Sequence, residues 1–211
     1  MKLYDAAISS ASSRVRIALA YKGLHAERVP VGIAGPDATN RAPAYLALNP
    51  QGLVPALYTD GGVLVTQSLA IVEYLEELQP QPALLPPTPE GRARARALAL
   101  AVASEIHALL THRVAARIRA IPVAGAGDDV LGDWKRHWME EGMAAYDAAL
   151  HPDDAFSVGA APTVADVFLY PQAVNAERAG LDLRRWPRVA GVVERLHRIP
   201  AFADNAPAPL R

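Results

Sequence analysis

The sequence changes its pattern once, at a proline-rich stretch. Residues Gln79–Pro89 read QPQPALLPPTP and hold five prolines in eleven positions, a composition that favours a stiff, extended linker. Before this stretch, short strand-like runs alternate with helical patterns, whereas after it only helical spacing is found. We therefore expect an α/β domain over residues 1–79, a linker over 80–89 and an all-helical domain over 90–211.

The first domain is predicted to follow the order β-α-β-α-β-β-α. Gly23 supplies a stop for the first helix, and Pro30 favours an edge position for the second strand because proline donates no ladder hydrogen bond. Asp60-Gly61-Gly62 is typical of a hairpin turn. The expected segments are a strand at 2–6, a helix at 13–23, a strand at 27–33, a short helix within 42–50, a hairpin over 55–66 and a helix over 68–78.

The second domain is predicted to consist of helices alone. Thr163 and Asp166 are three positions apart at the start of one helical pattern, which is typical of a capping box and indicates a folding role for both. Gly180 ends that pattern. Helical spacing runs over 90–121, 130–150, 163–180 and 186–199, and PVAGAGD at 122–128 interrupts it.

The composition excludes several classes of partner and site. With 21 basic and 22 acidic residues the net charge is −1, so no strong electrostatic attraction to nucleic acid or an anionic membrane is expected. The chain has no cysteine, which excludes disulfides and cysteine-zinc sites, and its histidines show no metal-ligand spacing. The N-terminus lacks an apolar signal-peptide core, and the apolar run Ala97–Ser104 is too short to span a bilayer. We expect a soluble, cytoplasmic protein without a metal.

Four serines stand in the five positions from Ser9 to Ser13, directly before a helical pattern. Serine oxygens commonly accept hydrogen bonds from the unpaired N–H groups that begin a helix. The same helix end also favours an anion and lowers the pKa of a thiol placed there. The residues alone leave both interpretations open, a helix cap and a thiolate site.

The serine stretch is also part of a wider resemblance. SSASSRVRIAL resembles the zeta-class glutathione transferase signature Ser-Ser-Cys-Ser-x-Arg-Val-Arg-Ile-Ala-Leu, and LNPQGLVPAL, TQSLAIVEYLEE, EIHALL and TVADVFLYPQ resemble further landmarks of that family in the same order. The likeness extends over essentially the whole chain. It implies the glutathione transferase fold, an α/β thioredoxin-like domain followed by an all-α domain, in a homodimer that binds glutathione and a small electrophile.

The resemblance assigns the thiolate site to Ser9, with Ser10 as the neighbour that could replace it. Ser12 is expected to be the helix cap. Ala11 stands at the family's cysteine position and Ile8 at an arginine position, so two groups associated with isomerase chemistry are missing. Alanine cannot form a mixed disulfide, and isoleucine cannot pair with a carboxylate.

The resemblance also implies residues that hold the rest of glutathione. A cis bond before Pro55 would turn the backbone of Val54 towards the ligand's cysteinyl peptide. Gln67 and Ser68 start a helix whose N–H groups would bind the γ-glutamyl carboxylate, although Ser68 would serve equally as a plain N-cap. His107 would lie near glutathione, unless it is an ordinary structural histidine.

Three functions follow, in order of expectation. The first is a transferase for general electrophiles, the second is a glutathione-dependent maleylacetoacetate or maleylpyruvate cis–trans isomerase, and the third is a glutathione-binding module without catalysis. Without a cation at Ile8 we expect slow turnover of a maleyl diacid. Arg113 and Arg178 could supply the missing charge if they do not belong to solvated helix faces.

Overall fold

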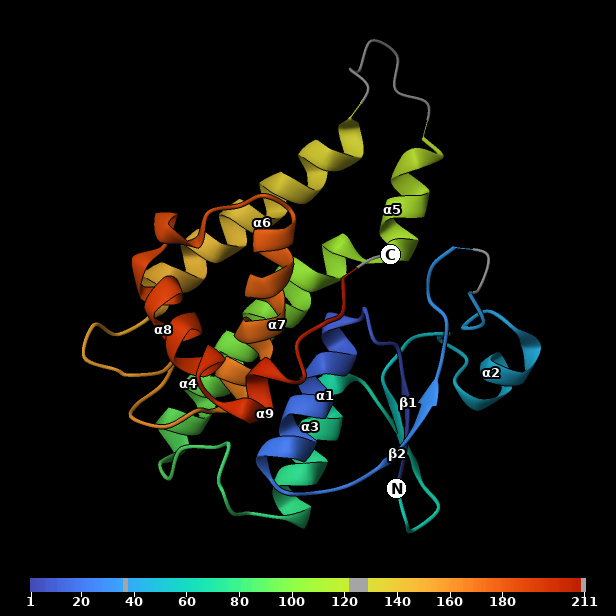
Figure 1. Ribbon diagram of the computed structural model, residues 1–211, viewed down its shortest axis with the longest axis horizontal. Helices are drawn as coiled ribbons and strands as arrows, with labels where there is room; N and C mark the ends of the chain where they lie inside the picture. The colour runs from blue at the N-terminus through green and yellow to red at the C-terminus, as the bar shows by residue number, and fades with distance from the viewer. Residues whose placement is uncertain (36–37, 122–128, 210–211) are drawn as a thin grey trace. The chain divides into compact units, whose positions relative to one another are not determined.

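The computed structural model describes residues 1–35, 38–121 and 129–209 and contains two compact units (Figure 1). The first unit joins residues 1–85 to the C-terminal segment from Leu196 onward, and the second spans Pro86–Arg195. Along the sequence, the boundaries between the two units fall at 85/86 and at 195/196. The domain boundaries drawn from the sequence, at 79 and 90, stay a prediction.

The first unit has the predicted order β-α-β-α-β-β-α, followed by a C-terminal turn of helix. Its four strands lie in the order β2-β1-β3-β4, with β1 and β2 parallel and the other pairs antiparallel. Pro30 is the last residue of the edge strand, as predicted. The elements are β1 (Lys2–Asp5), α1 (Ser10–Tyr21), β2 (Glu27–Pro30), α2 (Pro43–Leu48), β3 (Ala56–Tyr58), β4 (Leu64–Thr66), α3 (Ser68–Leu78) and α9 (Pro200–Ala203).

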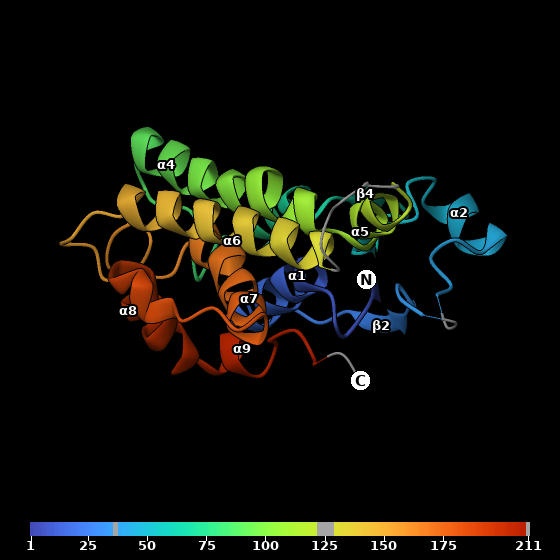
Figure 2. The same ribbon diagram turned by 90° about the horizontal axis from the view of Figure 1, so that it is seen from above.

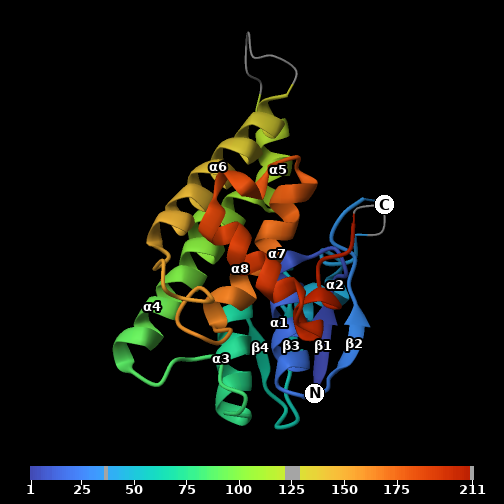
Figure 3. The ribbon, with the colours of Figure 1, turned by 60° about the vertical axis from the view of Figure 1, so that its left-hand side comes forward.

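Alternation along β1 places different side chains against the two faces of the sheet. Leu3 is fully buried, and α1 and α3 pack side by side on one face (Figure 3). Tyr4 points the other way, where its ring lies 6.0 Å from that of Tyr45 in α2. The sheet is therefore covered by helices on both faces, as in the thioredoxin-like fold expected from the resemblance.

The proline-rich stretch is anchored to this unit rather than free-standing. The buried ammonium of Lys22 donates to the carbonyls of Gln79 at 2.7 Å and Pro82 at 2.9 Å. The same ammonium pairs with Glu76, whose carboxylate also accepts from the N–H of Leu84 at 3.0 Å. Because a buried lysine needs oxygen partners, the start of the stretch is held in place.

In the described residues of the second unit, 86–121 and 129–195, every regular element is a helix. Its elements are α4 (Pro89–Leu100), a π-helix (Ala101–Ile106), a 3₁₀-helix (His107–Leu110), α5 (His112–Arg119), α6 (Val130–Ala149), α7 (Val164–Arg178), a second 3₁₀-helix (Leu183–Arg185) and α8 (Pro187–His197). Helical spacing at 90–121 is thus divided among four segments. The expected interruption at 122–128 lies outside the described residues. Figure 2 shows α4 and α6 running beside each other.

Among the described residues, no helix is both long and apolar enough to cross a membrane.

The predicted capping box at the start of α7 is confirmed. The carboxylate of Asp166 is fully buried and accepts from the N–H of Thr163 at 2.7 Å, from its hydroxyl at 3.0 Å and from the N–H of Ser157 at 2.8 Å. Burial raises the pKa of the Asp166 carboxyl, although these hydrogen bonds oppose the shift. Asp166 therefore joins the loop before α7 to the helix itself.

Replacing Asp166 by alanine should destabilise the protein by about 2–4 kcal/mol, because buried donors on Thr163 and Ser157 lose their acceptor. Chemical denaturation monitored by circular dichroism measures this change. Asp182→Ala is the control, since Asp182 is an exposed cap of a 3₁₀-helix and its loss should have little effect. Equal stability of the Asp166→Ala variant and the unsubstituted protein would contradict the assigned role.

Candidate active site

Ser9 caps α1 and keeps its own hydroxyl hydrogen for another partner. Its Oγ accepts from the N–H of Ser12 at 3.1 Å, and a backbone N–H can only donate. The hydroxyl of Ser9 must therefore donate elsewhere, and the described residues offer no acceptor for it. A cap and a thiolate donor are compatible roles for Ser9, since one uses the oxygen and the other the hydrogen.

The residues next to Ser9 have different roles at the start of α1. Ser12 is not the cap that we expected, because its Oγ accepts instead from the N–H of Ala6 at 3.4 Å, so α1 begins at Ser10 rather than at 13. Ser10 is the first helical residue and is buried. Ala11 is buried and Ile8 is half-buried. Because alanine and isoleucine have neither a thiol nor a charge, these two positions add no such group to the helix start.

The loop before β3 presents an unpaired piece of backbone. The Val54-Pro55 bond is cis, as predicted. The preceding carbonyl, that of Leu53, accepts from the hydroxyl of Tyr45 at 2.7 Å and from the amide of Asn49 at 2.8 Å. Within the described part of the chain no group bonds to the N–H or C=O of Val54. This backbone can therefore pair with an extended peptide as an added strand would.

Gly52 is required for that loop to close. Its φ is +61°, and a Cβ there would lie only 2.8 Å from the carbonyl oxygen of Asn40. A side chain at this position would meet rigid backbone, not a flexible side-chain end.

The start of α3 has a strained residue and uncapped donors. Gln67 adopts φ +69° and is the N-cap, but its side chain makes no capping bond and donates instead to Gln51 Oε1 at 2.9 Å. Such a conformation costs a non-glycine residue about 1–3 kcal/mol and is concentrated at functional sites. The first N–H groups of α3 have no acceptor within the helix. A helix end with such N–H groups is suited to bind an anion.

Ser68 is the first residue of α3 and not its N-cap, so the plain capping role considered for it is wrong. Its Oγ accepts from Nη1 of Arg14 at 3.1 Å. Both side chains are buried, and burial lowers the pKa of the Arg14 guanidinium to about 9. Sequence reasoning missed Arg14, although an arginine one helical turn before the apolar pair Ile17 and Ala18 was a usable signal.

Three predicted site residues belong to the second unit. His107 is half-buried at the point where the π-helix gives way to a 3₁₀-helix. Arg113 on α5 and Arg178 at the end of α7 are exposed in the structure. The other predicted site residues all belong to the first unit, and they are Ser9, Ser10, Val54, Pro55, Gln67 and Ser68.

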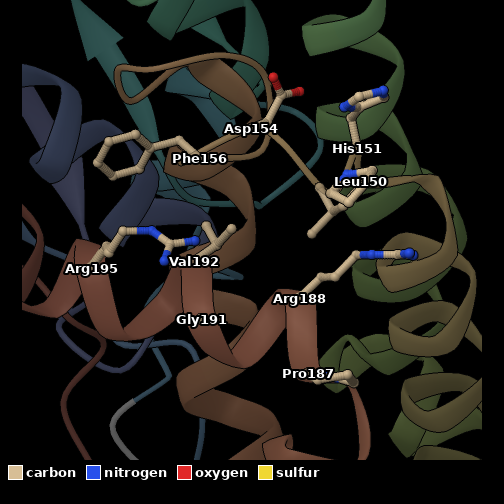
Figure 4. Close-up of a pocket in the computed structure, with 10 residues that line it drawn as sticks. Leu150, His151, Asp154, Phe156, Pro187, Arg188, Gly191, Val192 and Arg195 are labelled. Carbon is tan, nitrogen blue, oxygen red and sulfur yellow. The ribbon is translucent and has the colours of Figure 1, made fainter.

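The hollow in Figure 4 contains none of the predicted site residues. It encloses about 170 Å³ and lies wholly within the second unit. Arg188 and Arg195 extend from α8 at its edge (Figure 4), and its carboxylate, that of Asp154, is paired with Arg94 at 3.0 Å. This hollow therefore gives no support to the glutathione site.

Comparisons with known proteins agree along the whole chain. Residues 8–78 match the family described as "Glutathione S-transferase, N-terminal domain". Maleylacetoacetate isomerase of Pseudomonas aeruginosa is 45% identical over 208 residues, which cover 99% of this chain and 96% of that protein.

Two solved structures are similar over nearly their full lengths. A holo structure of maleyl pyruvate isomerase, a bacterial glutathione S-transferase in the zeta class, has a TM-score of 0.90 at 39% identity, covering 99% of this chain and 97% of that chain. Maleylacetoacetate isomerase of Methylobacterium extorquens AM1, solved with bound malonate and glutathione, has a TM-score of 0.90 at 34% identity and covers 100% of both chains.

Replacing Ser9 by alanine should raise the pKa of the thiol of bound glutathione by about 1–2 units, because a hydrogen bond to a charged group contributes about 1.5–3 kcal/mol. Thiolate absorbance followed against pH measures the shift. Ser10→Ala is the matched control. A shift in the Ser10 variant alone would move the assignment by one residue, and no shift in either would leave both serines with structural roles only.

Proposed function

Because the chain belongs to the zeta class of the glutathione S-transferase family, we propose that it is a glutathione-dependent cis–trans isomerase of a maleyl-type diacid, with maleylacetoacetate or maleylpyruvate as substrate. The proposal reverses the order drawn from the sequence alone, which put a general transferase first. The observation that carries it is the donor hydroxyl of Ser9 at the start of α1. The names of full-length relatives supply the substrate class.

Glutathione is proposed to lie along the first unit with three of its groups recognised separately. The thiolate accepts from the hydroxyl of Ser9 and gains from the positive end of α1. The cysteinyl peptide pairs with the backbone of Val54, which precedes Pro55. The γ-glutamyl carboxylate binds at the start of α3, where Gln67 and Ser68 lie.

Other site roles rest on the family resemblance. Ser10 would act in place of Ser9 if the thiolate lay one residue along, and His107 would contact glutathione from the second unit. On the same basis we propose a cytoplasmic homodimer. Sedimentation of the purified protein tests the dimer, and a monomer at micromolar concentration would contradict it.

The reaction needs a sulfur nucleophile and no redox partner. The thiolate adds to one carbon of the cis double bond, a C–S bond forms, and the π electrons move onto the conjugated carbonyl oxygen as an enolate. Rotation about the new single bond follows. The enolate then re-forms the double bond in the trans geometry and expels the thiolate. Since glutathione's sulfur is the nucleophile, Ala11 does not block these steps.

Conjugation of glutathione to a general electrophile remains the second candidate function. It uses the same thiolate at Ser9 and keeps the new C–S bond: the enolate formed from a conjugated acceptor takes up a proton, and an aryl halide releases its halide ion. The absence of a cation at Ile8 favours it, because a diacid needs partners for two carboxylates. In the isomerase, Arg113 and Arg178 are the proposed partners of those carboxylates.

Turnover of purified protein with a maleyl diacid and, separately, with an aryl halide decides between the candidates. The isomerase should convert the diacid while total glutathione stays constant, since each thiolate is released. Consumption of glutathione with the aryl halide, together with no conversion of the diacid, would support the transferase instead. Failure with both substrates would support a binding module.

Replacing Ile8 by arginine should raise kcat/KM for the diacid by about tenfold, equivalent to about 1.4 kcal/mol of transition-state stabilisation. The new cation would lie beside the start of α1 and pair with a substrate carboxylate. Arg113→Ala and Arg178→Ala are the companion variants. Suppose that the unsubstituted enzyme isomerises the diacid efficiently, that one of these variants loses this activity and that Ile8→Arg does not raise kcat/KM. The carboxylate partner then lies in the helical unit.

A further inference from the structure

The structure assigns a positioning role to Arg14: we infer that it holds the hydroxyl of Ser68 as a hydrogen-bond donor and places a buried positive charge behind the carboxylate that binds at the start of α3. The inference deepens the proposed function, because the carboxylate it concerns is the γ-glutamyl carboxylate of glutathione. No catalytic contact with the reacting sulfur is attributed to Arg14.

The first step concerns the direction of one hydrogen bond. Nη1 of Arg14 lies 3.1 Å from Oγ of Ser68, and a guanidinium has donors only. The oxygen of Ser68 is therefore the acceptor, and its hydroxyl hydrogen must point to a different partner. A carboxylate accepts hydrogen bonds and donates none when ionised, so it is the ligand group that this arrangement suits.

The second step concerns where Arg14 lies. It is on α1, which packs against α3, and only 1% of its surface is exposed. Ser68 is 7% exposed, so water screens the charge weakly on both sides of the hydrogen bond. Desolvation lowers the pKa of Arg14 to about 9, which leaves the group cationic at neutral pH. An anion arriving at Ser68 would offset part of that desolvation.

The third step is the local backbone. Gln67, directly before Ser68, has φ +69°, and no side chain caps the helix that follows. The N–H groups, the hydroxyl of Ser68 and the charge of Arg14 thus act on the same end of α3. Arg14 comes from a different helix, so the carboxylate site depends on how α1 and α3 pack together.

Arg16 is a matched control on the same helix. It is also buried, at 6% exposure, but its Nη1 donates to the carboxylate of Asp5 at 2.6 Å and its Nη2 to the carbonyls of Asn205 and Ala206 at 3.4 Å. Its charge is already paired with a carboxylate of β1. Losing Arg16 should weaken the fold without changing the preference for a ligand carboxylate.

The experiment compares two ligands by titration calorimetry with the full chain. One is glutathione, and the other is the analogue in which 4-aminobutanoyl replaces γ-glutamyl, so that only this carboxylate is missing. Arg14→Met should weaken glutathione binding about tenfold and leave the affinity for the analogue nearly unchanged. Ser68→Ala should cost less in the Arg14→Met background than in the unsubstituted protein, because the two residues act together.

Arg14→Lys keeps the charge with a conservative change and should restore part of the preference for glutathione. If the Arg14→Met variant does not fold, which thermal unfolding would show, Arg14→Lys replaces it as the test variant. Arg16→Met should lower the unfolding temperature yet keep the full preference.

Two results would overturn the inference. One is an equal loss of affinity for glutathione and for the analogue in the Arg14 variants, which is a purely structural effect. The other is an unchanged preference for glutathione over the analogue in folded Arg14 variants. A different result would overturn the proposed function itself, namely no glutathione binding by the unsubstituted protein at millimolar concentration.

Discussion

The burial of α1 is the constraint on which the first unit depends. Every residue from Ser10 to Leu19 is buried, although the segment carries two arginines and three serines. Since buried polar groups need partners, several of them join α1 to other parts of the unit. Ser13 donates to the carbonyl of Asn205 at 2.6 Å, and Arg16 pairs with Asp5 on β1. The polar groups of α1 therefore fix both the first strand and the C-terminal segment against the same helix.

The same burial supports the proposed glutathione site at the N-terminal ends of α1 and α3. Hydrogen bonds within the unit use the oxygen of Ser9 and the oxygen of Ser68, and in both cases the partner is a donor-only group. Each hydroxyl hydrogen is left to donate outward. The backbone of Val54 adds a third group without an internal partner in the described residues. A thiolate, an extended peptide and a carboxylate are the complements of these three groups, and glutathione contains all of them.

Local signals predicted the order of elements, but they did not predict the tertiary partners. Pro30 at an edge strand and the Thr163–Asp166 capping box depend on residues close in sequence, and both were confirmed. The start of α1 was placed three residues late, because the choice between Ser9 and Ser12 as cap depends on how β1 turns into the helix. The hydrogen bond from Arg14 to Ser68 joins residues 54 positions apart, which no local pattern records. The anchoring of Gln79 and Pro82 by Lys22 was missed for the same reason.

The lack of a cysteine removes a protein thiol that an electrophilic substrate could modify. A maleyl diacid is an electrophile, and a protein thiol beside the bound substrate could be alkylated by it. This chain has no cysteine at any position, so glutathione brings the thiol that the chain itself lacks. In the proposed function the sulfur chemistry then depends on a single thiolate, which we propose is held by Ser9 and stabilised by the start of α1. Ala11 is therefore compatible with repeated turnover. Ile8 concerns a separate question, which is what cationic side chains pair with the carboxylates of the proposed diacid substrate.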